Sequence, residues 1–577
     1  MSLPSLLAVP ELLHVYSARA EVAFMAAQAE HEAGGLPVPE AFREDFWRVT
    51  AASDFVAGQL ARDPQLLLEA HNANLLRRSL EPGELRAMLE ARLQDCDDED
   101  DLGRRLRRFR NQQQLRIIWR DVTRQAALVE TCRDLSDMAD ACVDLAYQWL
   151  YQRHALQFGT PMGKCSGTPQ HMVILGMGKL GAHELNLSSD IDLIFAYPEG
   201  GETQGVKRTL DNQEFFIRVG QRLIKALDAI SVDGFVFRTD MRLRPYGSAG
   251  ALALSFNALE QYYQDQGRDW ERYAMIKARV VAGDQQAGAV LIEMLRPFVY
   301  RRYLDFSAIE ALRAMKLLIQ QEVRRKGMAD NIKLGSGGIR EVEFIAQVFQ
   351  LIHGGRDLSL QQRSLLGVLS NLRDQSYLPA AAVDEMQQGY EFLRYTEHAL
   401  QAIDDRQTQM LPDNEVDQAR VASMLGFAGW TEFHLQLMHW RARIDGHFRQ
   451  VIADPDEDAA EQAAGAAGAE WLPLWEEAVE PESAIHQLED AGFADAPAAF
   501  KRIIDLKRGP QVRAMQRMGR GRLDGFMPRL LAQVAEHKAP DRVLERVLPL
   551  VEKVVRRSAY LVLLSENPGA LQRLIRL

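Results

Sequence analysis

The stretch that decides the fold lies between His171 and Tyr197 and reads HMVILGMGKLGAHELNLSSDIDLIFAY. A short apolar run leads into glycines, and a second apolar run begins just after a pair of aspartates. These runs predict two strands joined by a glycine loop and a short helix. Asp190 and Asp192 stand two residues apart at the start of the second strand, so their side chains are expected to point the same way. The stretch therefore predicts a small α/β unit with two carboxylates aimed at one point.

The two carboxylates suit a site for metal ions and phosphate. Carboxylates held close together repel each other unless cations neutralise them, and Mg²⁺ prefers carboxylate oxygens together with substrate phosphates. Gly178 lets a phosphate approach the N-terminus of the predicted short helix, and Lys179 adds a positive charge there. The alternative is a pair of surface acids at a strand end. The apolar residues that follow them favour a buried strand instead.

A dinucleotide-binding site is a second alternative, because Gly176, Gly178 and Gly181 match the pattern GxGxxG. That fold needs a full helix after the glycines and an acidic residue about 20 positions further on. Here the next strand begins only about ten residues after Gly181. The spacing therefore excludes the dinucleotide interpretation.

A third carboxylate is expected from the segment GFVFRTDMRLRP, which starts at Gly234. If this segment is a strand to Arg244, then Asp240, Arg242 and Arg244 share one face. One carboxylate with two arginines suits a site for metal and phosphate. A solvated edge strand is the alternative.

Two later segments are rich in charged residues. The segment from Gly267 to Arg279 predicts a helix with a basic end, and the segment from Asn331 to Phe344 predicts a glycine turn that enters a helix. The acids in the first turn of the second helix are explained equally well by the helix dipole. The candidate phosphate ligands in the two segments are Lys277, Arg279 and Lys333, and the acids are Glu341 and Glu343.

Outside these segments apolar residues recur every three to four positions, which predicts helices. A chain of 577 residues is expected to form about two to four domains. We predict a mostly α, multidomain protein with an embedded α/β core. The expected parts are an N-terminal helical region at 1–165, the core at 166–290, a helical bundle domain at 291–453, a linker at 454–470 and a further helical region at 471–577.

The composition indicates the cellular location of the protein and excludes some classes of partner. The net charge of −12 disfavours a general nucleic-acid binder. No apolar run is long enough to span a membrane, and no signal peptide is expected. The four cysteines form no CxxC pair, so we predict neither a zinc site nor disulfides, and a cytoplasmic location. An acidic run from Asp95 to Asp101 precedes an arginine-rich run from Arg104 to Arg110. It predicts an acidic loop before a basic helix face, with a docking surface for a charged partner as the alternative.

Five motifs of the sequence read GMGKLGAHELNLSSDIDLIF, RTDMRLRPYGSAG, GRDWERYAMIKAR, IKLGSGGIREVEF and DRQTQMLP. They resemble those of glutamine synthetase adenylyltransferase/adenylyl-removing enzymes, and the resemblance runs from about residue 50 to the C-terminus. It implies a nucleotidyltransferase core of the DNA polymerase β type among helical bundles. The family's full enzyme is a tandem of two such units. One unit adenylylates a tyrosine of glutamine synthetase with ATP, and the other removes the AMP by phosphorolysis and releases ADP.

The motif variants resemble the removing half. GRDWERYAM belongs to that half, and Glu341 stands where the transferring half has an aspartate. The tail RRSAYLVLLSENPGALQRL resembles the approach to the second unit, so we expect an N-terminal half. One departure is Gly181-Ala182-His183, where the family often has three glycines, and it puts a role for His183 in doubt.

The resemblance also implies the site and its partners. Asp190, Asp192 and Asp240 would be catalytic and bind two Mg²⁺ ions, with Mn²⁺ as the other candidate. The expected partners are glutamine synthetase, the PII signalling protein, phosphate and ADP or ATP, with no nucleic acid and no membrane. The nucleotide and phosphate ligands would be Gly178, Lys179, Ser189, Arg242, Arg244, Lys277, Arg279, Lys333, Glu341 and Glu343.

Three rival functions differ in what they require. Adenylylation in the forward direction uses the same catalytic residues and differs only in the motif variants. A histidine-aspartate phosphohydrolase is excluded, because no histidine is followed by aspartate and no HExxH occurs. A silent scaffold would be expected to lack one of the three aspartates, and all three are present.

Overall fold

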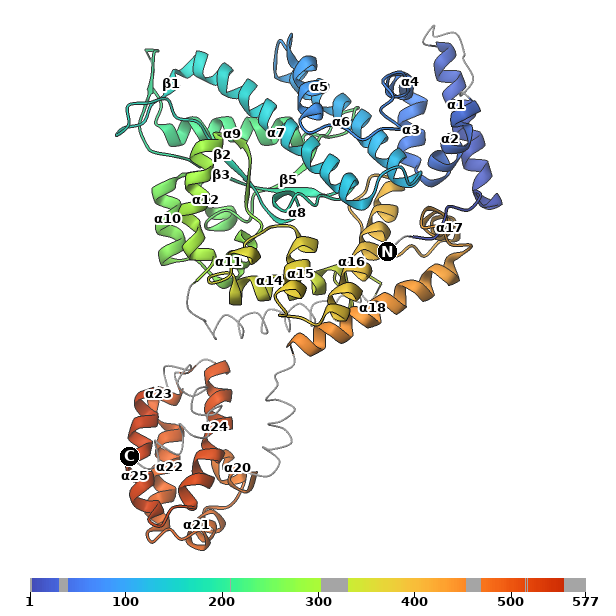
Figure 1. Cartoon of the computed structure of the whole chain (residues 1–577). Helices are drawn as coiled ribbons and strands as arrows, with labels where there is room; N and C mark the ends of the chain where they lie inside the picture. The colour runs from blue at the N-terminus through green and yellow to red at the C-terminus, as the bar shows by residue number, and fades with distance from the viewer. Residues whose placement is uncertain are drawn as a thin grey trace. The chain divides into compact units, whose positions relative to one another are not determined.

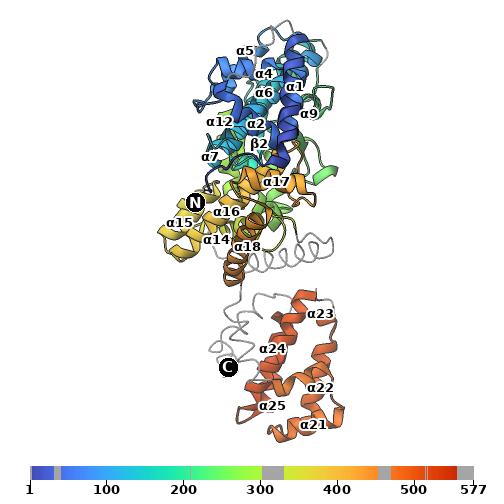
Figure 2. The ribbon, with the colours of Figure 1, turned by 90° about the vertical axis from the view of Figure 1, so that its right-hand side faces the viewer.

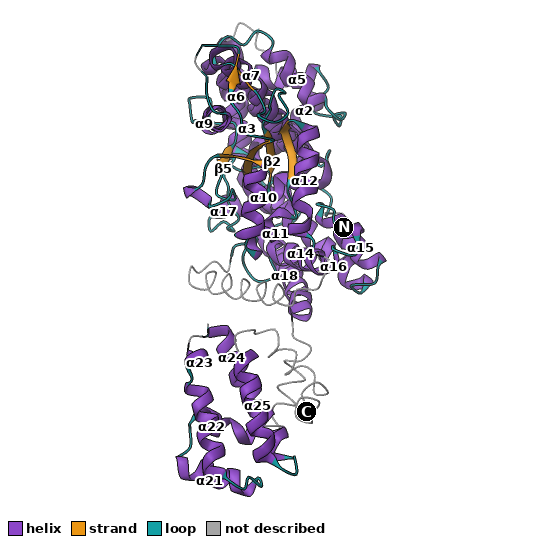
Figure 3. Ribbon diagram, turned by 90° about the vertical axis from the view of Figure 1, so that its left-hand side faces the viewer, coloured by secondary structure: helices purple, strands orange, loops and turns teal. Residues whose placement is uncertain are grey.

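The computed structural model describes residues 3–30, 40–207, 209–301, 330–452, 469–513, 515 and 517–554. The chain divides into two compact units, 1–449 and 450–577 (Figure 1). In the first unit the strands are enclosed by helices (Figure 3). No helix in the described part of the chain is long and apolar enough to cross a membrane. The predicted mostly helical fold with a small embedded sheet is confirmed.

Helices fill the chain up to the core, as predicted. Ser53 caps α3 by accepting a hydrogen bond from Val56 N, and Asp98 caps α6 by accepting one from Asp101 N. The arginine-rich run lies within α6, where Arg104 pairs with Asp101. The elements are η1 Glu11–Leu13, α1 His14–Glu30, α2 Glu40–Ala52, α3 Asp54–Arg62, α4 Gln65–Asn72, α5 Glu84–Leu93, α6 Glu99–Val122 and α7 Leu128–Phe158.

The core is a mixed sheet with the strand order β5-β3-β2-β7, and β6 also pairs with β3. β2 is antiparallel to β3 and β7, whereas β3 is parallel to β5 and β6. A separate pair joins β1 to β4. The strands are β1 Thr160–Pro161, β2 Val173–Gly176, β3 Asp190–Tyr197, β4 Thr203–Gln204, β5 Arg238–Asp240, β6 Ala253–Ser255 and β7 Arg279–Gly283.

Helices cover the sheet and line its connections. α7 packs against β7 and α9, and α12 packs against β2 and β7. The helices between and beyond these strands are α8 Gly178–Gly181, α9 Asn212–Asp228, η2 Gly247–Ala249, α10 Phe256–Asp265, α11 Asp269–Met275 and α12 Gln285–Val299.

Two elements are shorter in the structure than the sequence predicted. The strand expected from Gly234 to Arg244 is limited to β5, because the Asp240 carboxylate accepts a hydrogen bond from Arg242 N and turns the chain. The helix expected from Gly267 to Arg279 ends at Met275, and Arg279 is the first residue of β7. The strands β6 and β7 were not predicted.

A second group of helices completes the first unit. The predicted glycine turn that enters a helix is confirmed, since α14 begins at Ile339. α17 lies next to the N-terminal helices (Figure 2), where Arg420 pairs with Asp54 at 2.7 Å. The elements are α14 Ile339–His353, η3 Leu358–Leu360, α15 Leu365–Asp374, α16 Ala380–Ala402, α17 Glu415–Met424 and α18 Trp430–Ile452.

The second unit is helical and has its own core. Trp475 is fully buried in it and donates a hydrogen bond to Asp524 at 2.9 Å. Of the linker predicted at 454–470, all but the last two residues lie outside the described part of the chain. The elements are η4 Ala469–Trp471, α20 Leu472–Glu476, α21 Pro481–Asp490, α22 Ala496–Arg508, α23 Pro510–Arg513, α24 Arg517–Ala535 and α25 Pro540–Val554.

Candidate active site

Two parallel strands bring the three predicted aspartates to one end of the sheet. Asp192 lies directly opposite Asp240 in the β3–β5 ladder, and Asp190 lies opposite Arg238. Ile191 is fully buried between the two aspartates of β3, which are both partly exposed. The side chains therefore alternate as the sequence predicted. We call Asp190, Asp192 and Asp240 the acidic triad.

The glycine loop after β2 presses against the acidic triad. Gly178 has φ +54°, and a Cβ atom placed on it would lie 3.2 Å from Oδ2 of Asp192. Met177 N donates a hydrogen bond to the backbone oxygen of Asp192 at 2.9 Å. Gly181 is also required, because a Cβ there would lie 1.9 Å from the backbone oxygen of Lys277. A small group can therefore approach the triad over the loop backbone.

The triad carries more negative charge than its protein neighbours balance. Burial, followed by the charges of Asp190 and Asp240, raises the pKa of Asp192 to about 7, while Lys333 and Arg242 act to lower it. Carboxylate oxygens with uncompensated charge are the donor set that Mg²⁺ and Mn²⁺ prefer. The residues present therefore fit a hard divalent cation.

Arg242 forms an ion pair with Asp240, the third carboxylate of the acidic triad. Its Nε and Nη2 atoms donate to Oδ2 of Asp240 at 2.8 and 2.5 Å, and these hydrogen bonds hold the pKa of Asp240 below its usual range. The Arg242 side chain is otherwise 77% exposed, so it is free to move. A cation that binds Asp240 therefore competes with this guanidinium.

A second cluster of potential ligands lies elsewhere in the core. Within the described residues, the one trio of His, Cys, Asp or Glu side chains with ligand atoms all within 4.8 Å of one another is Asp137, Asp140 and His183. The ligand atoms of the acidic triad do not all lie within this distance of one another. Asp140 is already bonded to Arg279 and His183 to Asp137, so both pairs also have a structural explanation.

Lys179 and Lys277 are engaged in buried ion pairs. Lys179 Nζ lies 2.8 Å from Glu397 Oε2, and burial lowers the pKa of this lysine to about 8. Lys277 Nζ lies 3.3 Å from Glu343, and although burial opposes its charge, Glu343 and Glu184 raise its pKa. Both ammonium groups are already paired with protein carboxylates, so they have less freedom to bind a phosphate than the sequence suggested.

Three other predicted ligands have structural contacts. Arg279 forms an ion pair with Asp140 at 2.6 Å and donates to the backbone oxygen of Leu180. Arg244 donates to the backbone oxygens of Met241, Ser248 and Gly250 and so folds the turn after β5. Ser189 Oγ donates to the backbone oxygen of Asp190 at 2.9 Å.

Lys333 remains the best-placed cation for a phosphate. Its charge acts on Asp192, yet no hydrogen bond or ion pair engages its ammonium group within the described residues. The turn that carries it is fixed by Asn331 Oδ1, which accepts from Lys333 N at 2.9 Å. Glu341 supports the same turn by accepting from Gly337 N at 2.9 Å.

Sequence reasoning missed two residues at the site. Gln407 donates to Oδ1 of Asp190 at 2.9 Å, and Glu397 pairs with Lys179. Gln407 lies within the motif DRQTQMLP, which was noted but given no role. Glu397 lies in the C-terminal third of α16, where nothing in the local pattern distinguishes it.

A mixed sheet that brings three aspartates beside a glycine loop is the arrangement of a nucleotidyltransferase. Residues 43–294 match the family described as glutamate-ammonia ligase adenylyltransferase. Residues 313–452 match a second family, described as GlnD PII-uridylyltransferase.

Curated relatives share most of this sequence. A bifunctional glutamine synthetase adenylyltransferase/adenylyl-removing enzyme of Pseudomonas aeruginosa is 70% identical over 582 residues, which cover 100% of this chain and 59% of that protein. Proteins of the same name from Pseudomonas syringae and Hahella chejuensis are 67% and 50% identical, and the matches cover 100% and 92% of this chain and 59% and 55% of theirs. The chain thus spans less than two thirds of the length of these relatives.

Proposed function

We propose that this chain removes AMP from an adenylylated tyrosine of glutamine synthetase by metal-dependent phosphorolysis and releases ADP. The observation that carries the proposal is the pairing of Asp192 with Asp240 beside the Gly178 loop, in a chain related to bifunctional adenylyl-transferring and adenylyl-removing enzymes. The direction rests on Glu341 and on the motif GRDWERYAM, which resemble the removing half. We also propose that the core is of the DNA polymerase β type.

The roles of the residues follow from their places. Asp190, Asp192 and Asp240 would hold two Mg²⁺ ions, with Mn²⁺ as the alternative metal. Bound divalent ions neutralise charge on phosphoryl and leaving oxygens. Lys333 would hold inorganic phosphate by its free ammonium group, and the Gly178 loop would let the α-phosphate come close to the triad. The leaving group is a phenol with a pKa near 10, so it departs more readily than an aliphatic alcohol.

The arrangement favours phosphate over water as nucleophile. Inorganic phosphate held by a cation lies close to the α-phosphorus, and the new P–O bond forms as the bond to the tyrosine oxygen breaks. The products are ADP and the unmodified tyrosine side chain of the synthetase, whose phenolate takes up a proton from water. Adenylylation of the same tyrosine with ATP is the second candidate, since it uses the same triad.

One assay tests the proposal. The chain is incubated with adenylylated glutamine synthetase, Mg²⁺ and labelled phosphate. We expect labelled ADP, little AMP, and little AMP transfer from ATP to unmodified synthetase. Efficient labelling of the unmodified synthetase would reverse the direction, and release of AMP alone would indicate hydrolysis.

Regulation by a PII protein is part of the proposal. It is supported by the match of residues 313–452 to a PII-uridylyltransferase family. A cytoplasmic location follows from the same proposed role, since its protein substrate is an enzyme of nitrogen metabolism. Co-elution of the chain with PII on size exclusion would support the first point, and two separate peaks at micromolar concentrations would contradict it.

A further inference from the structure

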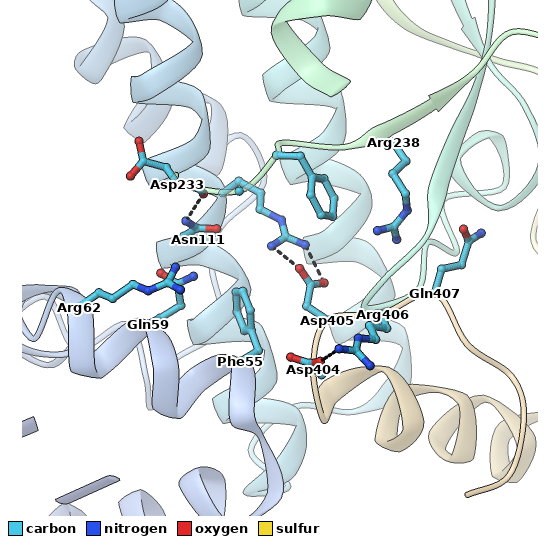
Figure 4. Close-up of a pocket in the computed structure, with 13 residues that line it drawn as sticks. Phe55, Gln59, Arg62, Asn111, Asp233, Arg238, Asp404, Asp405, Arg406 and Gln407 are labelled. Carbon is cyan, nitrogen blue, oxygen red and sulfur yellow. Dashed lines mark hydrogen bonds and ion pairs between the residues drawn. The ribbon is translucent and has the colours of Figure 1, made fainter. Parts of the chain in front are cut away.

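A pocket of about 500 Å³ lies beside the acidic triad on the β5 side (Figure 4). Gln407 and Arg238 both line it. Gln407 donates to Asp190, and Arg238 lies opposite Asp190 in the β3–β5 ladder. A group bound in this pocket would therefore lie next to the triad on the side away from β2, the strand that carries the glycine loop.

The wall of the pocket is built from stacked rings and guanidinium groups. The Arg110 guanidinium lies 5.5 Å from the ring centre of Phe55 and 5.2 Å from that of Phe235, and Arg238 lies 4.8 Å from the ring centre of Phe235. Arg110 is 3% exposed and forms two hydrogen-bonded contacts with Asp405, at 2.7 and 2.8 Å. The wall is therefore rigid before any ligand binds.

Among the described residues, two arginines at the pocket keep an Nε donor without a partner, although Arg110 pairs with Asp405 through its other nitrogens. Asp405 is used by Arg110, and Asp404 pairs with Arg406 at 2.7 Å. The Nε atoms of Arg110 and Arg238 are buried without a hydrogen-bond partner. Buried donors of this kind are costly unless an acceptor reaches them.

One more arginine at the pocket is available. Arg62 lines it from α3, and within the described residues no hydrogen bond or ion pair engages its side chain. Figure 4 shows the Asp233 carboxylate turned away from Asp405 and Arg238. The pocket is therefore suited to a ligand that carries a negative charge.

The loop that leads into the pocket at Asp233 favours a protein ligand over a small anion. Ile230 and Val232 are 84% and 89% exposed in the loop that leads to Asp233. Asn111 Nδ2 donates to the backbone oxygen of Asp233 at 3.0 Å and holds this loop against α6. These two apolar side chains, held beside the pocket, give a protein ligand apolar surface to bury, which a small anion could not use.

We infer that this pocket and the loop Ile230–Val232 bind the segment of the protein substrate that flanks its modified tyrosine, and that this segment presents a carboxylate to Arg62 and an apolar side chain to Val232. The inference rests on the proposed function, because it assumes a protein substrate. It adds where that substrate docks and what chemistry it offers there.

The test compares a protein substrate with a small one. The double variant Arg62→Gln/Val232→Ser changes the pocket entrance without touching the triad. The substrates are adenylylated glutamine synthetase and the phenyl ester of AMP. We expect KM for the protein to rise about tenfold while turnover of the ester stays within about twofold of the wild type. The matched control, Arg19→Gln/Val22→Ser, alters exposed residues of α1. It is expected to change neither the KM for the protein nor the turnover of the ester.

A binding measurement separates this inference from the proposed function. Unmodified glutamine synthetase is immobilised, and binding of the full-length chain and of both double variants is recorded. If the wild type processes neither substrate, the proposed function is wrong, and weaker binding of the pocket variant alone still supports the docking site. Equal binding of all three proteins, or equal loss on both substrates, would overturn it.

Discussion

Lys179 and Glu397 form a buried ion pair with Nζ and Oε2 2.8 Å apart, although 218 residues separate them in the sequence. Lys179 belongs to the glycine loop that borders the acidic triad, and Glu397 lies on α16. The pair therefore fixes the loop to the second helical segment of the first unit. Arg394 also approaches Glu397, at 3.5 Å, so the glutamate balances two buried cations.

Glu397→Gln is expected to destabilise the protein by about 3 to 5 kcal/mol, because removing one partner leaves buried positive charge without compensation. The double variant Lys179→Met/Glu397→Gln is expected to regain part of that loss. Urea unfolding followed by tryptophan fluorescence gives both values. Glu415→Gln, at an exposed position of α17, is the control and should stay near the wild type. A single variant as stable as this control would contradict the role of the pair.

Asp192→Asn is expected to abolish turnover while the protein keeps or slightly raises its melting temperature. The amide is a poorer ligand for a divalent cation, and it removes a charge that repels Asp190 and Asp240. Turnover and melting are measured on the same preparation. Asp265→Asn, at the exposed end of α10, is the control. Near-normal turnover of Asp192→Asn would remove this residue from the site.

Mg²⁺ is expected to raise the melting temperature of the wild type, because a ligand that binds only the folded state stabilises it by mass action. The rise should vanish in Asp192→Asn and persist in His183→Ala, which changes the second cluster of potential ligands. Differential scanning fluorimetry over millimolar Mg²⁺ decides between the two sites. The opposite pattern would place the ion at Asp137, Asp140 and His183.

Stability is expected to fall as the pH rises from about 6.5 towards 8. Although burial opposes the charge of His398, its contacts with Asp121 and Cys132 raise its pKa to about 9. The folded state then binds more protons than the unfolded state, so this stabilisation is complete below about 6.5 and is lost as the pH rises through about 9. Lys179 acts in the opposite direction above about pH 8, because burial lowers its pKa to about 8. Urea midpoints between pH 6 and 8 should therefore decline in the wild type and less in His398→Phe. Equal slopes would contradict the raised pKa.

The local pattern of the sequence was enough to predict the strand that carries two of the aspartates. Alternation over Asp190–Tyr197 is set by the strand itself, so the common direction of Asp190 and Asp192 followed without knowledge of the rest of the chain. The same reasoning failed after Asp240. There a side chain bonded to its own backbone ends the strand, and alternation continues in the sequence although the chain turns.

The charged residues around the site were harder to assign. Lys179 was predicted as a phosphate ligand because it follows the glycine loop, and Lys277 and Arg279 because they form the basic end of a charged segment. Their carboxylates come from α16, α14 and α7 instead. A sequence shows where the charges are, whereas their pairing depends on which distant helices meet. The assignment of the triad to metal ions stays a prediction.

The alignment of β5 with β3 has a consequence for how the protein tolerates change. Side chains alternate along a strand, so a shift of β5 by a single residue would place Thr239 opposite Asp192 and send Asp240 to the other side of the sheet. β5 has only three residues with which to hold its alignment. The turn that Arg244 holds by hydrogen bonds also fixes this alignment, so lengthening or shortening that turn is expected to abolish the proposed activity although the protein still folds and all three aspartates are still present.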